Sequence, residues 1–187
     1  MMARWPLIAA LLLSACGAAA TPGDDNQVAA MAGAEPQLRA MLPMAMFSGQ
    51  TMAMAAYASG IEANCAVVRP AFETAVAKYL PTWRANLVKA YRDNVPAETL
   101  AKATADARGA ASAAMMPYRD KIAAQMQAAS MPVLVAAATD VTLAATKAAA
   151  GIDIKMVDGA KRMAEMNAAQ ADGSLFCGLR PDKQETR

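Results

Sequence analysis

Residues 72–91, with the sequence FETAVAKYLPTWRANLVKAY, decide the fold class. Large apolar and aromatic side chains recur here at every third or fourth position, which places them on one face of an α-helix. These side chains are Phe72, Val76, Leu80, Trp83, Leu87 and Tyr91. Pro81 lies within the pattern, and we expect it to kink or divide the helix because proline lacks a backbone donor and clashes with the preceding turn.

The rest of the chain continues the helical pattern, since no segment shows a sustained alternation of apolar and polar residues. Pro96 fits the first position of a helix that should run to about residue 114. A longer helix, interrupted by Pro117 and Pro132, should follow, and a shorter one should cover residues 158–170. We therefore expect an all-α fold, a bundle of about five helices with proline kinks.

The composition excludes several classes of function. The chain has 187 residues with 18 basic and 16 acidic side chains, so its net charge of +2 gives no electrostatic case for binding nucleic acid. It has no histidine, which excludes a Ser-His-Asp or Cys-His catalytic set and a histidine-rich zinc site. We expect a protein that is not an enzyme and that carries no cofactor and no metal ion.

Residues 1–15 have the three parts of an export signal, namely a positive charge at Arg4, an apolar core over residues 7–13 and small residues before a cleavage site. The core is shorter than the roughly 20 apolar residues that span a bilayer. The residues LSAC at positions 13–16 resemble the lipobox of bacterial lipoproteins. This resemblance implies that Cys16 carries a diacylglycerol on its sulfur and becomes the first residue of the mature chain. The alternative is an ordinary secretory signal in which this cysteine occurs by chance.

The same resemblance implies a location. In Gram-negative lipoproteins an aspartate after the cysteine commonly retains the protein in the inner membrane, and Gly17 at this position points instead to the outer membrane, facing the periplasm. Two or more acyl chains would anchor the protein stably. We divide the chain into a signal peptide (1–15), a lipidated terminus with a flexible tether (16–26), a helical domain (27–180) and a polar tail (181–187).

The remaining two cysteines predict a disulfide. With Cys16 committed to lipid, Cys65 and Cys177 form the one available pair in an oxidising compartment. The alternative is two unpaired thiols that the fold holds apart. A catalytic thiol is less favoured, because the chain has no Cys-x-x-Cys sequence and no histidine to activate one.

Two segments of the mature chain resemble a family of small exported bacterial helical proteins with no assigned activity. They are residues 28–34 (VAAMAGA), which lead into residues 38–46 (LRAMLPMAM), and residues 91–100 (YRDNVPAETL). The aromatic-Arg-Ser-Pro-x-Gly segment of that family is absent, because residues 105–111 read ADARGAA. The resemblance implies a helical bundle and no functional residue.

Residues 40–61, AMLPMAMFSGQTMAMAAYASGI, contain five methionines and no charge. The simplest interpretation is a central helix that is apolar on every side because the other helices surround it. A second is a groove for a lipid tail or an apolar peptide, since methionine side chains repack readily. Its candidate lining residues are Met41, Met44, Met52 and Tyr57. A third is a Cu(I) site, because thioethers are soft ligands, although residues two apart on a helix point to nearly opposite sides.

Together these patterns predict a lipid-anchored helical protein with a non-enzymatic binding or structural role in the bacterial cell envelope. Its expected partners are the membrane and either an envelope protein or an apolar ligand. The alternative function is carriage of an apolar ligand, or less favourably of Cu(I), by residues 40–61.

Overall fold

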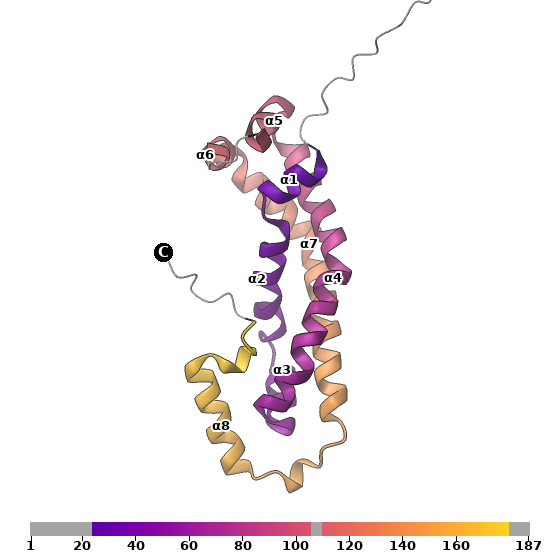
Figure 1. Cartoon of the computed structure of the whole chain (residues 1–187), viewed down its shortest axis with the longest axis vertical. Coiled ribbons are helices and arrows are strands. Elements are labelled where there is room, and N and C mark those ends of the chain that lie inside the picture. The colour runs from indigo at the N-terminus through magenta and orange to yellow at the C-terminus, as the bar shows by residue number, and fades with distance from the viewer. Residues whose placement is uncertain (1–23, 106–109, 180–187) are drawn as a thin grey trace, which may run out of the picture.

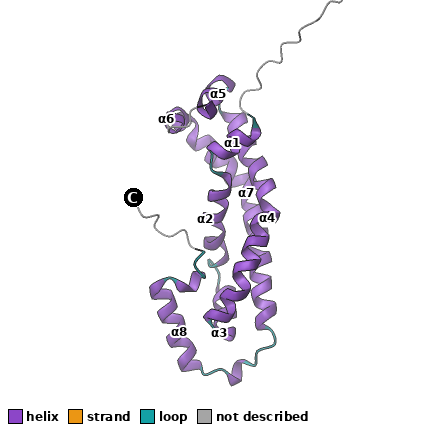
Figure 2. Ribbon diagram, viewed as in Figure 1, coloured by secondary structure: helices purple, strands orange, loops and turns teal. Residues whose placement is uncertain are grey.

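The computed structural model describes residues 24–105 and 110–179, and this part of the chain is all-α (Figures 1 and 2). Two long helices, α4 (Ile61–Asn94) and α7 (Arg119–Ala149), run antiparallel along the molecule. Polar contacts join them at two levels: Asn86 Nδ2 donates to the carbonyl oxygen of Ala129 at 3.0 Å, and Lys78 Nζ to Asp140 at 2.7 Å.

Shorter helices surround this pair. Helices α2 (Ala34–Met46) and α3 (Gln50–Ser59) lie along it, and α1 (Asp25–Met31), α5 (Ala97–Ala105) and α6 (Ala110–Met115) gather at one end (Figure 1). Helix α8 (Gly159–Asp172) lies at the other end. Three short 3-10 helices complete the described elements: η1 (Met116–Tyr118), η2 (Ile154–Met156) and η3 (Ser174–Phe176).

The core confirms the amphipathic pattern of α4. Phe72, Val76, Trp83 and Leu87 are each 2% exposed, and Leu80 and Tyr91 pack against them half-buried. The core residues that the structure describes lie between positions 28 and 177, and they come from α1 through to the segment that follows α8.

Helix α4 is undivided at Pro81, and Pro70 also lies within it. Of the two outcomes expected at Pro81, division of the helix was therefore wrong, and a kink there stays a prediction. Pro81 is exposed, so its ring occupies the solvent side and packing of the opposite face holds the helix together. Helix α7 likewise continues through Pro132.

Several predicted boundaries also change. The helix expected from Pro96 to residue 114 occurs as α5 and α6, with residues 106–109 outside the described part of the chain. Helix α1 begins at Asp25, within the predicted tether, because Asp24 and Gln27 form a reciprocal capping box. The bundle consequently has more helices than the five expected. The C-terminal helix is confirmed, and the Asp158 side chain caps it by accepting from the backbone N–H of Lys161.

The predicted disulfide is present between Cys65 on α4 and Cys177 after η3, with 5.1 Å between their Cα atoms. The two residues are 112 positions apart in the sequence. The bond therefore fixes the end of the described chain to the start of the longest helix.

Candidate functional site

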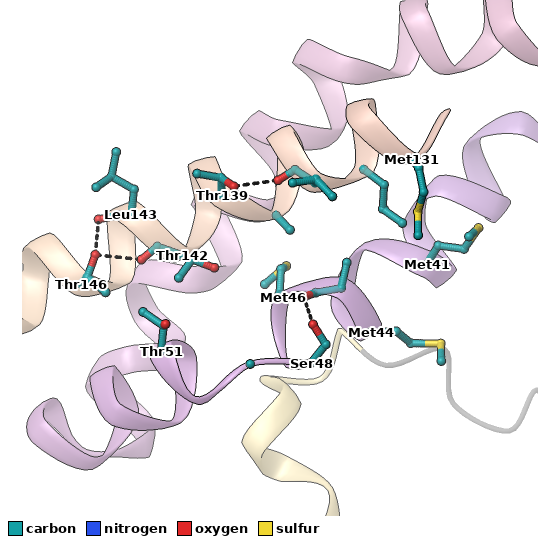
Figure 3. Close-up of a pocket in the computed structure, with 15 residues that line it drawn as sticks. Met41, Met44, Met46, Ser48, Thr51, Met131, Thr139, Thr142, Leu143 and Thr146 are labelled. Atoms are coloured by element: carbon teal, nitrogen blue, oxygen red, sulfur yellow. Dashed lines mark hydrogen bonds between the residues drawn. The ribbon is translucent and has the colours of Figure 1, made fainter. Parts of the chain in front are cut away.

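An apolar groove of about 680 Å³ lies between α2, the start of α3, and α7 (Figure 3). We call it the α2–α7 groove. Its lining residues are Met41, Met44, Ala45, Met46, Ser48, Gly49, Thr51, Met131, Leu134, Val135, Ala138, Thr139, Thr142, Leu143 and Thr146. None of them is charged. The volume falls within the usual range for small-molecule sites, roughly 300–1,000 Å³.

The wall from α2 consists mainly of methionines. The opposite face of α2 packs into the core through Leu38 and Leu42, which are fully buried. Met41 and Met44 consequently point outward and are 43% and 67% exposed, whereas Met46 lies deeper and is 3% exposed. The sequence Met-Leu-Pro-Met-Ala-Met over residues 41–46 thus places thioethers at several depths of one groove.

The wall from α7 is a stripe with helical spacing. Its lining residues recur every three or four positions over positions 131–146, which corresponds to a length of about 22 Å at 1.5 Å per residue. Ala138 is buried at the floor, while Val135 and Leu143 are 58% and 48% exposed at the rim. Large apolar side chains are therefore open to solvent along the groove, which is typical of an interaction site.

The hydroxyl groups in the groove are largely occupied by their own helices. Thr139 Oγ1 donates to the carbonyl oxygen of Val135 at 2.8 Å, and Thr146 Oγ1 to that of Thr142 at 3.0 Å. Ser48 Oγ donates to the carbonyl oxygen of Ala45 at 2.8 Å (Figure 3). Since these three donors already have acceptors within the protein, they need no hydrogen-bond acceptor from a ligand in the groove.

Asp140 follows Thr139 on α7 but belongs to the contact with α4 and not to the groove. Its carboxylate accepts hydrogen bonds from Lys78 Nζ and from Tyr79 Oη, at 2.7 and 3.0 Å. The bond from Lys78, with that from Tyr79, lowers the pKa of Asp140 below its usual value. The charge beside the groove is therefore balanced by α4, and the groove itself stays uncharged.

Two of the four predicted lining residues are brought together in the groove, and two are not. Met41 and Met44 line it. Met52 instead lies in the core with no exposed surface, with its sulfur 4.0 Å from Nδ2 of the buried Asn64. Tyr57 faces α8, where its hydroxyl lies 3.1 Å from the position that a Cβ on Gly159 would take. The predictions for Met52 and Tyr57 were wrong, because Met52 is enclosed in the core and Tyr57 lies against the start of α8.

The expectation of one central, surrounded helix over residues 40–61 was also wrong. The chain breaks at Phe47–Gly49 between α2 and α3, and Met54 is 55% exposed. Met44 points away from Met41 and Met131 in Figure 3, while Met46 lies further along the groove. Three of the lining thioethers thus come from α2 and one from α7, and the four do not converge on one point. Among residues 24–105 and 110–179, no group of three His, Cys, Asp or Glu side chains is placed to hold a metal ion.

Sequence reasoning missed the α7 wall altogether. The signal was available, because Met131, Val135, Thr139, Thr142 and Thr146 form an uncharged stripe with helical spacing. By length and composition, Ala113–Ala149 is the one described helix that is long and apolar enough to cross a membrane, although only 33% of its most apolar window is buried. The structure assigns part of that apolar surface to the groove.

Cys16, the predicted lipidation site, lies outside the described residues. The chain matches no protein-family model, no curated protein and no solved structure.

Proposed function

We propose that this protein is a non-enzymatic binding protein of the bacterial cell envelope that holds one long acyl chain in the α2–α7 groove. The observation that carries the proposal is an uncharged groove whose exposed rim is apolar and in which three of the five hydroxyl side chains, those of Ser48, Thr139 and Thr146, already donate to carbonyl oxygens. Such a surface gains free energy by covering hydrocarbon, at about 0.8 kcal/mol per buried CH₂ group. The length of the α7 wall suits an extended chain.

An acyl chain suits the groove better than an apolar peptide, which is the other occupant of similar hydrophobicity. A peptide brings backbone N–H and C=O groups, and each one that is buried without a partner costs free energy. The groove offers no charged side chain, and the hydroxyls of Ser48, Thr139 and Thr146 already donate to carbonyl oxygens, which leaves those of Thr51 and Thr142 for a whole peptide backbone. Hydrocarbon needs none of these partners.

The location belongs to the same proposal. The lipobox-like residues 13–16 support acylation of Cys16, and Gly17 supports retention at the outer membrane with the folded part in the periplasm. The disulfide between Cys65 and Cys177 is in keeping with an oxidising compartment. An anchored protein would meet lipid at close range, which makes an acyl chain an accessible ligand.

The test uses residues 17–187 exported to an oxidising compartment, since this stretch contains every described core residue and lacks Cys16, so it carries no lipid of its own. The probe is N-phenyl-1-naphthylamine, an uncharged dye that fluoresces in apolar sites. We expect saturable binding at one site and displacement of the dye by palmitate. Val135→Lys places a charge at the groove rim and should weaken binding about tenfold or more, or ~1.4 kcal/mol.

The matched control is Met163→Lys on α8, because Met163 is 52% exposed against 58% for Val135 but does not line the groove. This variant should bind the dye as the unsubstituted chain does. Equal loss in both variants, or no saturable binding at all, would show that the groove is not the site. Displacement of the dye by an apolar peptide but not by palmitate would assign the groove to a peptide instead. The groove would be assigned to Cu(I) if the protein formed a stoichiometric Cu(I) complex and the Met44→Leu, Met46→Leu double variant did not.

A further inference from the structure

The segment that follows α8 returns to the bundle next to the groove. The turn is made at Gly173, whose φ is 81°, and η3 follows over Ser174–Phe176. Cys177 then adopts a left-handed conformation with a φ of 58°, which non-glycine residues seldom do. We call η3 together with Cys177 the C-terminal clasp.

Two bonds hold the clasp on α4. One is the disulfide from Cys177 to Cys65. The other is a hydrogen bond of 2.9 Å from Arg69 Nε to the carbonyl oxygen of Cys177. Cys65 and Arg69 are four residues apart and so lie on the same face of α4. This arrangement fixes the conformation of the clasp and the direction of the adjacent Phe176.

Phe176 packs on Phe47, with 4.8 Å between the ring centroids and 55° between the ring planes. Phe47 is the residue at which α2 ends, and the next two residues, Ser48 and Gly49, line the groove. In Figure 3 the pale yellow end of the clasp lies beside this corner. A clasp anchored on α4 thus contacts the turn that forms one end of the groove.

The corner between α2 and α3 has only local hydrogen bonds among those described. Gly49, the N-terminal cap of α3, has no side chain and supplies no cap hydrogen bond. Within the corner itself, the backbone N–H of Phe47 donates to the carbonyl oxygen of Pro43 at 3.0 Å, and Ser48 Oγ bonds to Ala45. Both of these bonds are local to the end of α2, whereas the Phe47–Phe176 contact joins the corner to the clasp, in addition to the packing of Phe47 against the core.

We propose that the C-terminal clasp positions the α2–α3 corner of the groove, and that the Cys65–Cys177 disulfide thereby sets the affinity of the groove for its ligand. This inference rests on the proposed function. Phe176 is a positioning residue, acting through Phe47 on Ser48 and Gly49. Reduction by a dithiol would add two electrons and two protons to the disulfide, leave two thiols on the protein, and convert the dithiol to its own disulfide. Phe176 would then lose its anchor on α4.

The test measures binding of N-phenyl-1-naphthylamine to residues 17–187 in the oxidised form, after reduction with dithiothreitol, and in Phe176→Ala with the disulfide intact. An aromatic pair contributes on the order of 1 kcal/mol, so Phe176→Ala should raise the Kd about fivefold. Reduction should raise it at least as much. Phe176→Tyr keeps the ring and should restore the affinity.

The matched control is Leu175→Ala, which truncates the neighbouring half-buried side chain of the same 3-10 helix and leaves the ring pair in place. We expect its Kd to stay near that of the unsubstituted chain, with all measurements made well below each variant's Tm. A Phe176→Ala protein that binds the dye as tightly as the unsubstituted oxidised chain would overturn the inference and leave the proposed function standing. Absence of dye binding in the oxidised unsubstituted chain would overturn both.

Discussion

At the residue scale, Gly60 is the position with the strictest requirement. It joins α3 to α4 with φ 88° and ψ 152°, a region that is essentially restricted to glycine. The guanidinium of Arg162, which also reaches toward the carbonyl oxygen of Ser59, covers the place where a Cβ would project, at 2.3 Å from Nη1. This close approach brings α8 against the end of α3.

Substitution of Gly60 by alanine should therefore lower the free energy of unfolding by about 1–3 kcal/mol, chiefly through backbone strain. Gly151→Ala is the control, because Gly151 has no neighbour within 4 Å of the added Cβ and its φ is not positive. Chemical denaturation of both variants measures the difference. Equal stability of the two would contradict the conformation assigned to Gly60.

A second residue-scale prediction concerns Glu73. Arg39 on α2 donates two hydrogen bonds of 2.8 Å to this carboxylate on α4, and they lower the pKa of Glu73 below its ordinary value of 4.5. A depressed pKa in the folded state contributes stability above the unfolded-state pKa, and that contribution is lost as the pH falls through the folded-state pKa.

Below about pH 4.5, we expect the Tm to decline less steeply with falling pH in Glu73→Gln than in the unsubstituted chain. The corresponding difference in the free energy of unfolding should be under ~1 kcal/mol, because the pair is exposed. Glu98→Gln is a second case within one helix, because the bond from Lys102 lowers the pKa of Glu98 as well, and this variant should flatten the profile in the same direction. Parallel pH profiles for the unsubstituted chain and Glu73→Gln would refute the role of the α2–α4 pair.

At the element scale, the disulfide joins the start of α4 to the clasp across a separation of 112 residues. The chain-entropy account gives a closed loop of that length about 4–5 kcal/mol, model-dependent and reduced by any strain in the folded state. Reduction should accordingly lower the Tm by ~10 °C for a chain of this size. Calorimetry with and without dithiothreitol measures this change in Tm. An unchanged Tm would show that the disulfide adds nothing to stability.

Also at the element scale, periodicity predicted the long helices well and the Met-rich segment poorly. The face of α4 that begins at Phe72 has large apolar side chains on one side only, so its burial follows from spacing. Residues 40–61 carry no charge on any side, so spacing alone gives no direction for Met44 or Met52. Their directions are set by the break at Phe47–Gly49 and by packing against α7, which are tertiary features.

At the scale of the whole molecule, the cysteine count and the helical patterns were enough to predict an all-α fold with one staple. The groove was only half predictable, because one wall comes from residues 41–51 and the other from residues 131–146. No local pattern states that α7 lies beside α2. The satisfied hydroxyls of Thr139 and Thr146 were equally hidden, since a threonine in a sequence gives no indication of its hydrogen-bond partner.

Processing is also a property of the whole molecule. If Cys16 carries lipid, the mature mass begins at Cys16 with acyl groups added, and Cys16→Ser gives a precursor that is neither acylated nor cleaved there. Intact-mass spectrometry of protein extracted from membranes measures both. A Cys16→Ser protein that is cleaved at the same bond and remains bound to the membrane would overturn the lipid anchor.

The most direct test of the central claim locates an acyl chain on the folded protein. Residues 17–187 are incubated with a palmitic acid analogue that carries a photoactivatable diazirine in mid-chain, irradiated, digested and sequenced by mass spectrometry. The account predicts labelling within residues 41–51 and 131–146, and its loss in Val135→Lys but not in Met163→Lys. The apolar loop after α7 provides an internal comparison, because Ile152, Ile154 and Met156 are 37%, 50% and 84% exposed outside the groove. Labelling of that loop in place of the groove, or labelling that Val135→Lys leaves unchanged, would contradict the account.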